Sequence, residues 1–246
     1  MVTKGGGGVG SEGGLCLVVS KRRWAMVVTK VAIDGSVNPR WLKAKVAVGG
    51  HSSVWIGLHY GVSSPTRNDK YQAAIKHVDK CVKMFQECER DCEHVVWMGD
   101  SNFIANTEID RAIWDQELDS YRAANSRDSS EYLHSTFVAH TEAQDMWIRM
   151  HGDKEGFTRQ HWGAREGIPA SLSRIDHIFA TDKVANSISK VGVAVGANVI
   201  ESDHRMLAVE LDLRALTGRV PEMWGKNDNH LQKSEERVVE SVKGIQ

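Results

Sequence analysis

The sequence predicts an α+β protein in which a helix covers one face of a β-sheet. The first observation is a series of short apolar runs, several with alternating apolar residues, a pattern typical of strands. The second is one amphipathic segment between the fourth and fifth runs. With 246 residues, 41% of them hydrophobic, the chain can bury the core of one large domain. The strand-like runs are Leu15–Val19, Ala25–Ile33, Trp41–Val48, Val54–Tyr60, Val95–Met98, Arg174–Ala180, Val191–Val195 and Arg205–Leu213.

The amphipathic segment predicts a helix that packs on the sheet. Its apolar residues fall at i, i+3, i+4, i+7, i+11 and i+14, so they share one face. They are Tyr71, Ala74, Ile75, Val78, Val82 and Phe85. The following segment, 102–162, has fewer strand signals and more polar residues, so we expect long loops there, of the kind that surround a site at a sheet end. A short helix that buries Trp147 is the expected exception.

Charge and hydropathy give little information about partners. The 31 basic and 32 acidic residues nearly cancel. The stretch 21–45 is basic, which would suit a phosphate backbone, but we favour the explanation that these are solvated lysines and arginines at strand edges. No apolar run approaches the roughly 20 residues that cross a bilayer, so we expect a soluble, intracellular protein, nuclear or cytoplasmic, without membrane contact. Three of the four cysteines share the predicted helix without a Cys-x-x-Cys pair, so reduced thiols are expected.

Three separate segments place chemically active side chains at the ends of apolar runs. They are Val95–Asn102, Ser173–Phe179 and Glu201–His204. Hydrolysis of a phosphoester needs a divalent cation, a carboxylate that positions water and a donor for the developing charge. The segments supply these groups as Asp100, Asn102, Asp176, Asp203 and His204.

Within these segments, Gly-Asp-x-Asn (99–102), Arg-Ile-Asp (174–176) and Ser-Asp-His (202–204) resemble the exonuclease/endonuclease/phosphatase superfamily of deoxyribonuclease-I-like hydrolases. The similarity extends over about residues 14–213, and its motifs are most similar to those of retrotransposon-type and abasic-site endonucleases. It implies a two-sheet β-sandwich flanked by helices. It also implies a Mg²⁺ cofactor, with Mn²⁺ as the second candidate.

The resemblance implies a role for each residue of the three motifs. Asp100 would activate water and contribute to the metal site, while Asn102 would bind the scissile phosphate. His204 would donate to the phosphoryl oxygen, and Asp176 would fix its tautomer and favour its protonated form. Asp203 would face the metal.

The resemblance also implies site roles for His59, Tyr60, Thr158 and Arg174. Because neighbours on a strand face opposite ways, only one of His59 and Tyr60, at the end of the fourth run, would fully reach the site. We favour Tyr60 because of the neighbouring Ser63-Ser64-Pro65 loop. A contact between His59 and Glu12 would require the glycine-rich residues 1–14 to fold back onto the domain. Thr158 and Arg174 would contact substrate.

The chain departs from the family pattern at its beginning. Members begin with strands that end in Asn and in Gln-Glu, and that Glu binds the metal, whereas residues 1–14 are glycine-rich. We therefore expect these strands to be missing, either because the sequence is a fragment or because it is a degenerate copy that has lost them. In both cases we expect weak binding of Mg²⁺. The expected division is a flexible head (1–14), the hydrolase-like domain (15–213), and a linker with a C-terminal helix (214–246).

Three functions are consistent with these features. The first is a Mg²⁺-dependent DNA endonuclease of retrotransposon type, for which DNA is preferred to RNA and protein partners stay open. The form Ser-Arg-Ile-Asp (173–176) favours it. The second is a phosphatase that acts on a small molecule or a lipid headgroup. The third is a non-catalytic remnant of the same fold.

Overall fold

A six-stranded mixed sheet forms the centre of the molecule, with the order β3-β4-β5-β6-β12-β9. The computed structural model describes residues 2–3, 15–17, 27–35, 40–49, 52–63, 65, 68–123, 130–162, 167–194, 202–212 and 215–216. The central strands are β3 (Val27–Ile33), β4 (Trp41–Gly49), β5 (Ser52–Tyr60), β6 (Val95–Asp100), β12 (Asp176–Ala180) and β9 (Gln144–Asp145).

One pair of central strands runs parallel. The strands β5 and β6 are joined by α1 (Asn68–Asp91), the helix that the apolar stripe predicts. A parallel pair needs a crossover connection, which α1 provides. The other neighbours in this sheet are antiparallel.

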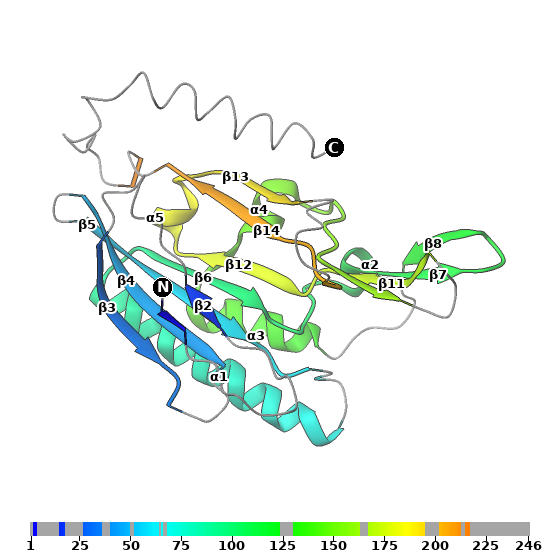
Figure 1. Cartoon of the computed structure of the whole chain (residues 1–246), viewed down its shortest axis with the longest axis horizontal. Coiled ribbons are helices and arrows are strands. Elements are labelled where there is room, and N and C mark those ends of the chain that lie inside the picture. Colours follow the sequence, from blue (N-terminus) through cyan, green and yellow to red (C-terminus); the bar gives the residue numbers. More distant parts are fainter. Residues whose placement is uncertain are drawn as a thin grey trace.

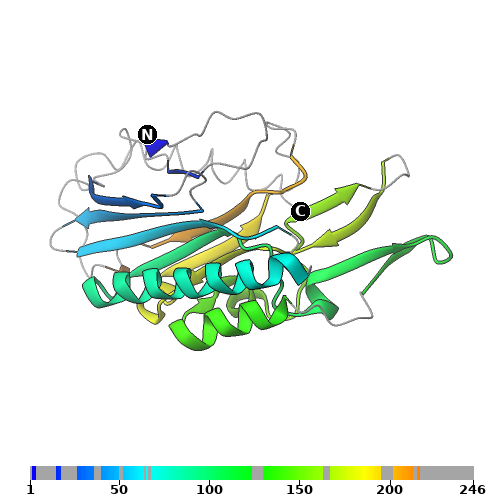
Figure 2. The ribbon, with the colours of Figure 1, turned by 90° about the horizontal axis from the view of Figure 1, so that it is seen from below.

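Both faces of the central sheet are covered. Neighbouring residues on a strand point to opposite faces, so Val54 and Trp55 of β5 belong to two separate hydrophobic cores. Val54 faces β13 (Ile188–Val193), β14 (Leu207–Leu211), α4 (Met146–His151) and α5 (Asp182–Ala185), whereas Trp55 faces α1 and α3 (Glu131–Thr141). Figure 2 shows α1 and α3 side by side along one face. The predicted two-sheet sandwich with flanking helices is confirmed, as is the burial of Trp147 in α4.

A second, four-stranded sheet extends from one end of the sandwich. Its order is β10-β11-β7-β8, and Figure 1 shows β7 and β8 projecting outward. The strands are β10 (Arg159–Trp162), β11 (Pro169–Ser173), β7 (Arg111–Asp115) and β8 (Ser120–Ala123), preceded by α2 (Thr107–Asp110). The expectation of loops in 102–162 is wrong here. Most side chains of β7, β10 and β11 are half-buried, so the sequence lacks the alternation that marks a strand over a core.

The chain ends are described only in part. Val2–Thr3 (β1) pairs with Cys16–Leu17 (β2), which confirms a strand in the first predicted run and corrects the expectation that the glycine-rich head contains none. The C-terminal helix expected within 231–242 lies outside the described residues. The domain boundaries and the missing family strands stay predictions. Over the described ranges, none of the helices has the length and apolar character needed to cross a membrane, and all four cysteines are free.

Candidate active site

Three strand ends meet at the edge of the sandwich from which the second sheet extends. Asp100 ends β6 and pairs in register with Asp176, which begins the antiparallel β12. On its other side Asp100 pairs with Tyr60, the last residue of the parallel β5. The register of the sheet therefore brings together residues that lie far apart in sequence.

His204 joins the two aspartates. Its Nδ1 lies 2.9 Å from Asp176 Oδ2 and its Nε2 lies 3.8 Å from Asp100 Oδ2. The side chains of His204, Asp100 and Asp176 are 25%, 15% and 18% exposed, so the group is accessible to a ligand. The predicted hydrogen bond between Asp176 and His204 is confirmed. With both nitrogens protonated, His204 can donate to one carboxylate and present its other N–H beside the second.

The surroundings shift the pKa values of two of these groups in the same direction. Burial and then the charge of Asp176 raise the pKa of Asp100 to about 6, against the opposing effect of His204. Burial alone would lower the pKa of His204, but the hydrogen bond that its Nδ1 donates to Asp176 and the charges of Asp176 and Asp100 outweigh it, so this pKa is raised. The imidazolium form is therefore stabilised, as predicted.

Asn102 follows Asp100 in a tight turn. Its backbone has φ of +53°, a left-handed conformation that Asn tolerates better than most residues. Its N–H donates to Asp100 Oδ1 at 3.0 Å, and its Nδ2 donates to the Gly61 carbonyl at 3.4 Å. Arg40 Nη1 donates to the same carbonyl at 2.8 Å, and its guanidinium lies 5.5 Å from the Tyr60 ring. Arg40 is thus a residue at the site rim that the sequence analysis missed.

Asp203 is held beside the site by the strand β10. Its carboxylate accepts a hydrogen bond from Arg159 Nε at 2.9 Å, and its carbonyl accepts one from Gln160 N–H at 2.8 Å. His204 forms an isolated bridge with Arg159. The segment that carries Asp203 and His204 is therefore fixed by backbone contacts to the second sheet.

Thr158 positions the start of β12. Its side chain is fully buried, and its hydroxyl accepts the N–H groups of Ile175 and Asp176, each at 3.2 Å. Substrate contact through this side chain is contradicted by its burial. The residue supports the site through Asp176, because it fixes the backbone from which that carboxylate projects.

His59 is enclosed in the core and does not face the site. It is 3% exposed, its Nδ1 accepts the indole N–H of Trp97, and its Nε2 lies 2.7 Å from Ser101 Oγ. Burial and then the nearby His77 and His177 hold its pKa well below the ordinary value. The prediction that His59 acts in catalysis is therefore corrected, whereas its suggested partner Glu12 lies outside the described residues. Tyr60 is half-buried, and its hydroxyl lies 3.4 Å from Ser63 Oγ.

Arg174 forms a buried ion cluster in place of the predicted substrate contact. The side chain is 2% exposed and binds both oxygens of Asp110, at 2.7 and 2.9 Å, and Asp145 Oδ2 at 3.1 Å. Asp145 also caps α4 and accepts hydrogen bonds from His134 and His177. Burial opposes ionisation of Asp145, but these bonds and the Arg174 charge outweigh it, so its pKa lies well below the ordinary value. Arg174 therefore ties the second sheet to the sandwich.

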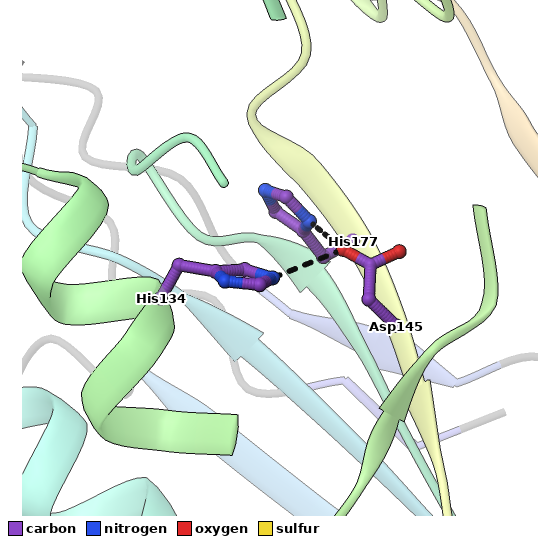
Figure 3. A group of neighbouring side chains, drawn as sticks. All are labelled: His134, Asp145 and His177. Atoms are coloured by element: carbon purple, nitrogen blue, oxygen red, sulfur yellow. Dashed lines mark hydrogen bonds and ion pairs between the residues drawn. The ribbon is translucent and has the colours of Figure 1, made fainter. Parts of the chain in front are cut away.

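His134, Asp145 and His177 are spaced as metal ligands could be (Figure 3), with candidate ligand atoms within 4.8 Å of one another. The Arg174 guanidinium already occupies this position, with Nη1 3.1 Å from Asp145 Oδ2 and 3.4 Å from His177 Nδ1. His177 Nδ1 also lies 2.8 Å from Asp145 Oδ2, and its Nε2 lies 3.0 Å from the Phe103 carbonyl, so both of its nitrogens already have hydrogen-bond partners. A hydrogen-bonded ion cluster accounts for the group without a metal.

Comparison with solved structures agrees with this architecture. The 3′-5′ exonuclease NExo from Neisseria meningitidis has a TM-score of 0.57 at 16% identity, over 77% of this chain and 71% of that chain. The 3′ phosphatase NExo from Neisseria, in a substituted form with a product DNA hairpin, has 0.59 at 18%, over 76% and 72%. An AP endonuclease from Archaeoglobus fulgidus has 0.52 at 18%, over 77% and 71%. The chain therefore has the deoxyribonuclease-I-like fold. No protein-family model and no curated protein matches the sequence.

The contacts of His204 predict its titration in the metal-free protein. Because its folded-state pKa lies above the ordinary 6.5, its contribution to stability is complete below pH 6.5 and is lost as the pH rises through the folded-state pKa. Asp176→Asn removes the charge that raises this pKa, so the imidazole should titrate at lower pH, measured by NMR of its ring protons. The control is Asp153→Asn, an exposed residue after α4. An unchanged His204 titration in Asp176→Asn would contradict the coupling.

The burial of Arg174 predicts a structural effect for its removal. Arg174→Gln leaves the carboxylates of Asp110 and Asp145 buried without their cation, which should lower the free energy of unfolding by about 3–5 kcal/mol. The matched control is Arg122→Gln, which removes an exposed pair with Asp115 and should cost at most about 1 kcal/mol. Urea denaturation measures both. Equal small losses would show that Arg174 is not the structural cation we describe.

Proposed function

We propose that the chain is a metal-dependent phosphodiester hydrolase that acts on DNA as an endonuclease, of the retrotransposon type. The observation that carries the proposal is the contact of His204 with Asp176 at 2.9 Å and its approach to Asp100 at 3.8 Å. Two carboxylates and one imidazole at a sheet end provide both a base and an acid beside a single ligand position.

Each residue of the group has a role that follows from its environment. Above its pKa of about 6, Asp100 is ionised and can accept a proton from an attacking water. The imidazolium of His204 can donate to a phosphoryl oxygen as negative charge develops, while Asp176 keeps the ring oriented. Asn102, held by Gly61 and the Asp100 turn, can bind the scissile phosphate. Tyr60, beside Asp100 in the sheet, is the proposed further phosphate contact.

The charges of the site fit a divalent cation. Asp100, Asp176 and Asp203 carry three negative charges when ionised, of which the imidazolium of His204 and the guanidinium of Arg159 offset two. Carboxylate oxygens are hard ligands of the kind that Mg²⁺ and Mn²⁺ prefer. We infer that Asp100 and Asp203 would hold Mg²⁺, with Mn²⁺ as the alternative, and such a cation would stabilise charge on the phosphoryl group.

Support for DNA as the substrate comes from the structural neighbours. One was solved with a product DNA hairpin and another is named as an AP endonuclease. The retrotransposon type rests on the sequence form Ser-Arg-Ile-Asp (173–176). A phosphatase is the second candidate, since one neighbour is named as a 3′ phosphatase.

Plasmid nicking tests this proposal. The chain should convert supercoiled plasmid to the nicked form with Mg²⁺ or Mn²⁺, and Asp176→Asn and His204→Gln should each lower the rate by about 10²–10⁴-fold, because each removes part of the acid-base apparatus. Asp153→Asn makes the same substitution outside the site, so this control should leave the nicking rate unchanged.

Parallel substrates separate the candidate functions. A duplex with an abasic site, a hairpin with a 3′ phosphate and a soluble inositol polyphosphate are incubated under the same conditions. Release of inorganic phosphate without nicking would favour the phosphatase. Failure to act on any of these substrates with either cation would contradict a hydrolase and favour the non-catalytic remnant.

A further inference from the structure

We propose that Arg159 is a built-in competitor of the divalent cation: its guanidinium is paired with Asp203 and offsets the negative charge that this carboxylate would offer to the cation. Arg159 thereby sets the cation affinity of the site. The inference rests on the proposed function, since it concerns the cation that Asp100 and Asp203 are proposed to hold.

The ion pair between Arg159 and Asp203 occupies a carboxylate oxygen of the proposed ligand. Arg159 begins β10, and its Nε lies 2.9 Å from Asp203 Oδ2. A carboxylate that is paired with a guanidinium offers less negative charge to a metal ion, so the two cations compete for the charge of Asp203. Occupancy by one lowers the apparent affinity for the other.

The backbone holds Asp203 in place without the Arg159 side chain. Gln160 N–H donates to the Asp203 carbonyl at 2.8 Å, and Arg205 N–H donates to the Thr158 carbonyl at 2.6 Å. Together with the bridge between residues 159 and 204, these bonds connect β10 to the segment on both sides of Asp203. The side-chain pair is therefore not needed to position the carboxylate, so its effect is on charge.

The pair is exposed enough to open. The side chains of Arg159 and Asp203 are 37% and 43% exposed, and pairs in such surroundings contribute little to stability because water screens them. The buried cluster of Arg174 with Asp110 and Asp145 shows the contrast, because none of its side chains is more than 3% exposed. Of these two arginines, Arg159 is the one that can exchange partners at low cost.

The charge of Arg159 affects both proposed ligands. Although partial burial favours the neutral acid, the hydrogen bond from Arg159 and the charges of His204 and Arg159 lower the pKa of Asp203. At Asp100, where burial raises the pKa, the charge of Arg159 acts in the opposite direction. A cation bound by Asp100 and Asp203 would therefore also experience repulsion from this guanidinium.

Removal of the guanidinium charge should strengthen cation binding. Arg159→Gln should lower the dissociation constant for Mn²⁺ about two- to fivefold, the range expected for loss of one screened ion pair. Arg159→Lys keeps the positive charge and should stay close to the original affinity. Arg122→Gln removes another exposed Arg–Asp pair, Nε to Asp115 Oδ2 at 2.8 Å on the β7–β8 hairpin, and should leave Mn²⁺ binding unchanged.

The experiment is a titration of the full chain with Mn²⁺ alone, in which electron paramagnetic resonance measures the concentration of the free ion. Thermal melting verifies that each variant is folded. Tighter binding in Arg159→Gln, lost again in the double variant with Asp203→Asn, supports the proposal. Equal or weaker binding in folded Arg159→Gln overturns it. If Arg159→Gln does not bind Mn²⁺ more tightly, but Asp203→Asn abolishes Mn²⁺ binding and the unaltered chain nicks plasmid DNA, only this inference fails. If none of the chains binds Mn²⁺ and none nicks DNA, the proposed function fails as well.

Discussion

The in-register pairing of β6 with β12 is the constraint on which the site depends. It places Asp100 opposite Asp176, although the two residues are far apart in sequence. Because side chains alternate along a strand, a shift of one residue would turn one of these carboxylates to the other face of the sheet. The same register sets β12 beside β6 along the core, where Phe179 pairs with Trp97. Packing of the interior and assembly of the site are therefore specified together.

Glycine residues permit the close approach of the strand ends. A Cβ at Gly61 would lie 2.0 Å from the Ser101 carbonyl oxygen, and one at Gly99 would lie 2.0 Å from the His59 carbonyl oxygen. Gly99 also has φ of +148°, in the range that favours glycine. Larger residues would push β5 and β6 apart where Asp100 ends β6, so the geometry of the site depends on these two positions as well as on its polar side chains.

The second sheet positions the segment that carries His204 and places the positive charge of Arg159 near the site. Arg174 connects it to the sandwich through buried ion pairs with Asp110 and Asp145, and β10 binds the segment that carries His204. A buried arginine with satisfied carboxylates is costly to disrupt, so the junction should be rigid. The exposed Arg159, at the beginning of β10, instead lies where its charge can act on the proposed cation site.

The sequence predicted the sandwich strands, α1 and the contact of Asp176 with His204, because each has a strong local pattern or motif. It did not predict the second sheet, whose half-buried strands lack alternation, or the parallel pairing of β5 with β6, which depends on tertiary packing. Arg174 and Thr158 were assigned to substrate because a motif gives no information on burial. Arg40 and Arg159 were missed because their roles arise from contacts between distant segments.

The central claim is that Asp100 and Asp203 belong to one cation-binding site at the end of the sandwich. A crystal of the chain grown with Mn²⁺, with anomalous diffraction recorded at the manganese edge, tests it most directly. The account predicts an anomalous peak within about 2.5 Å of carboxylate oxygens of both residues, with His134, Asp145 and His177 free of metal. A peak bound by those three buried residues, or no peak at saturating Mn²⁺, would contradict it.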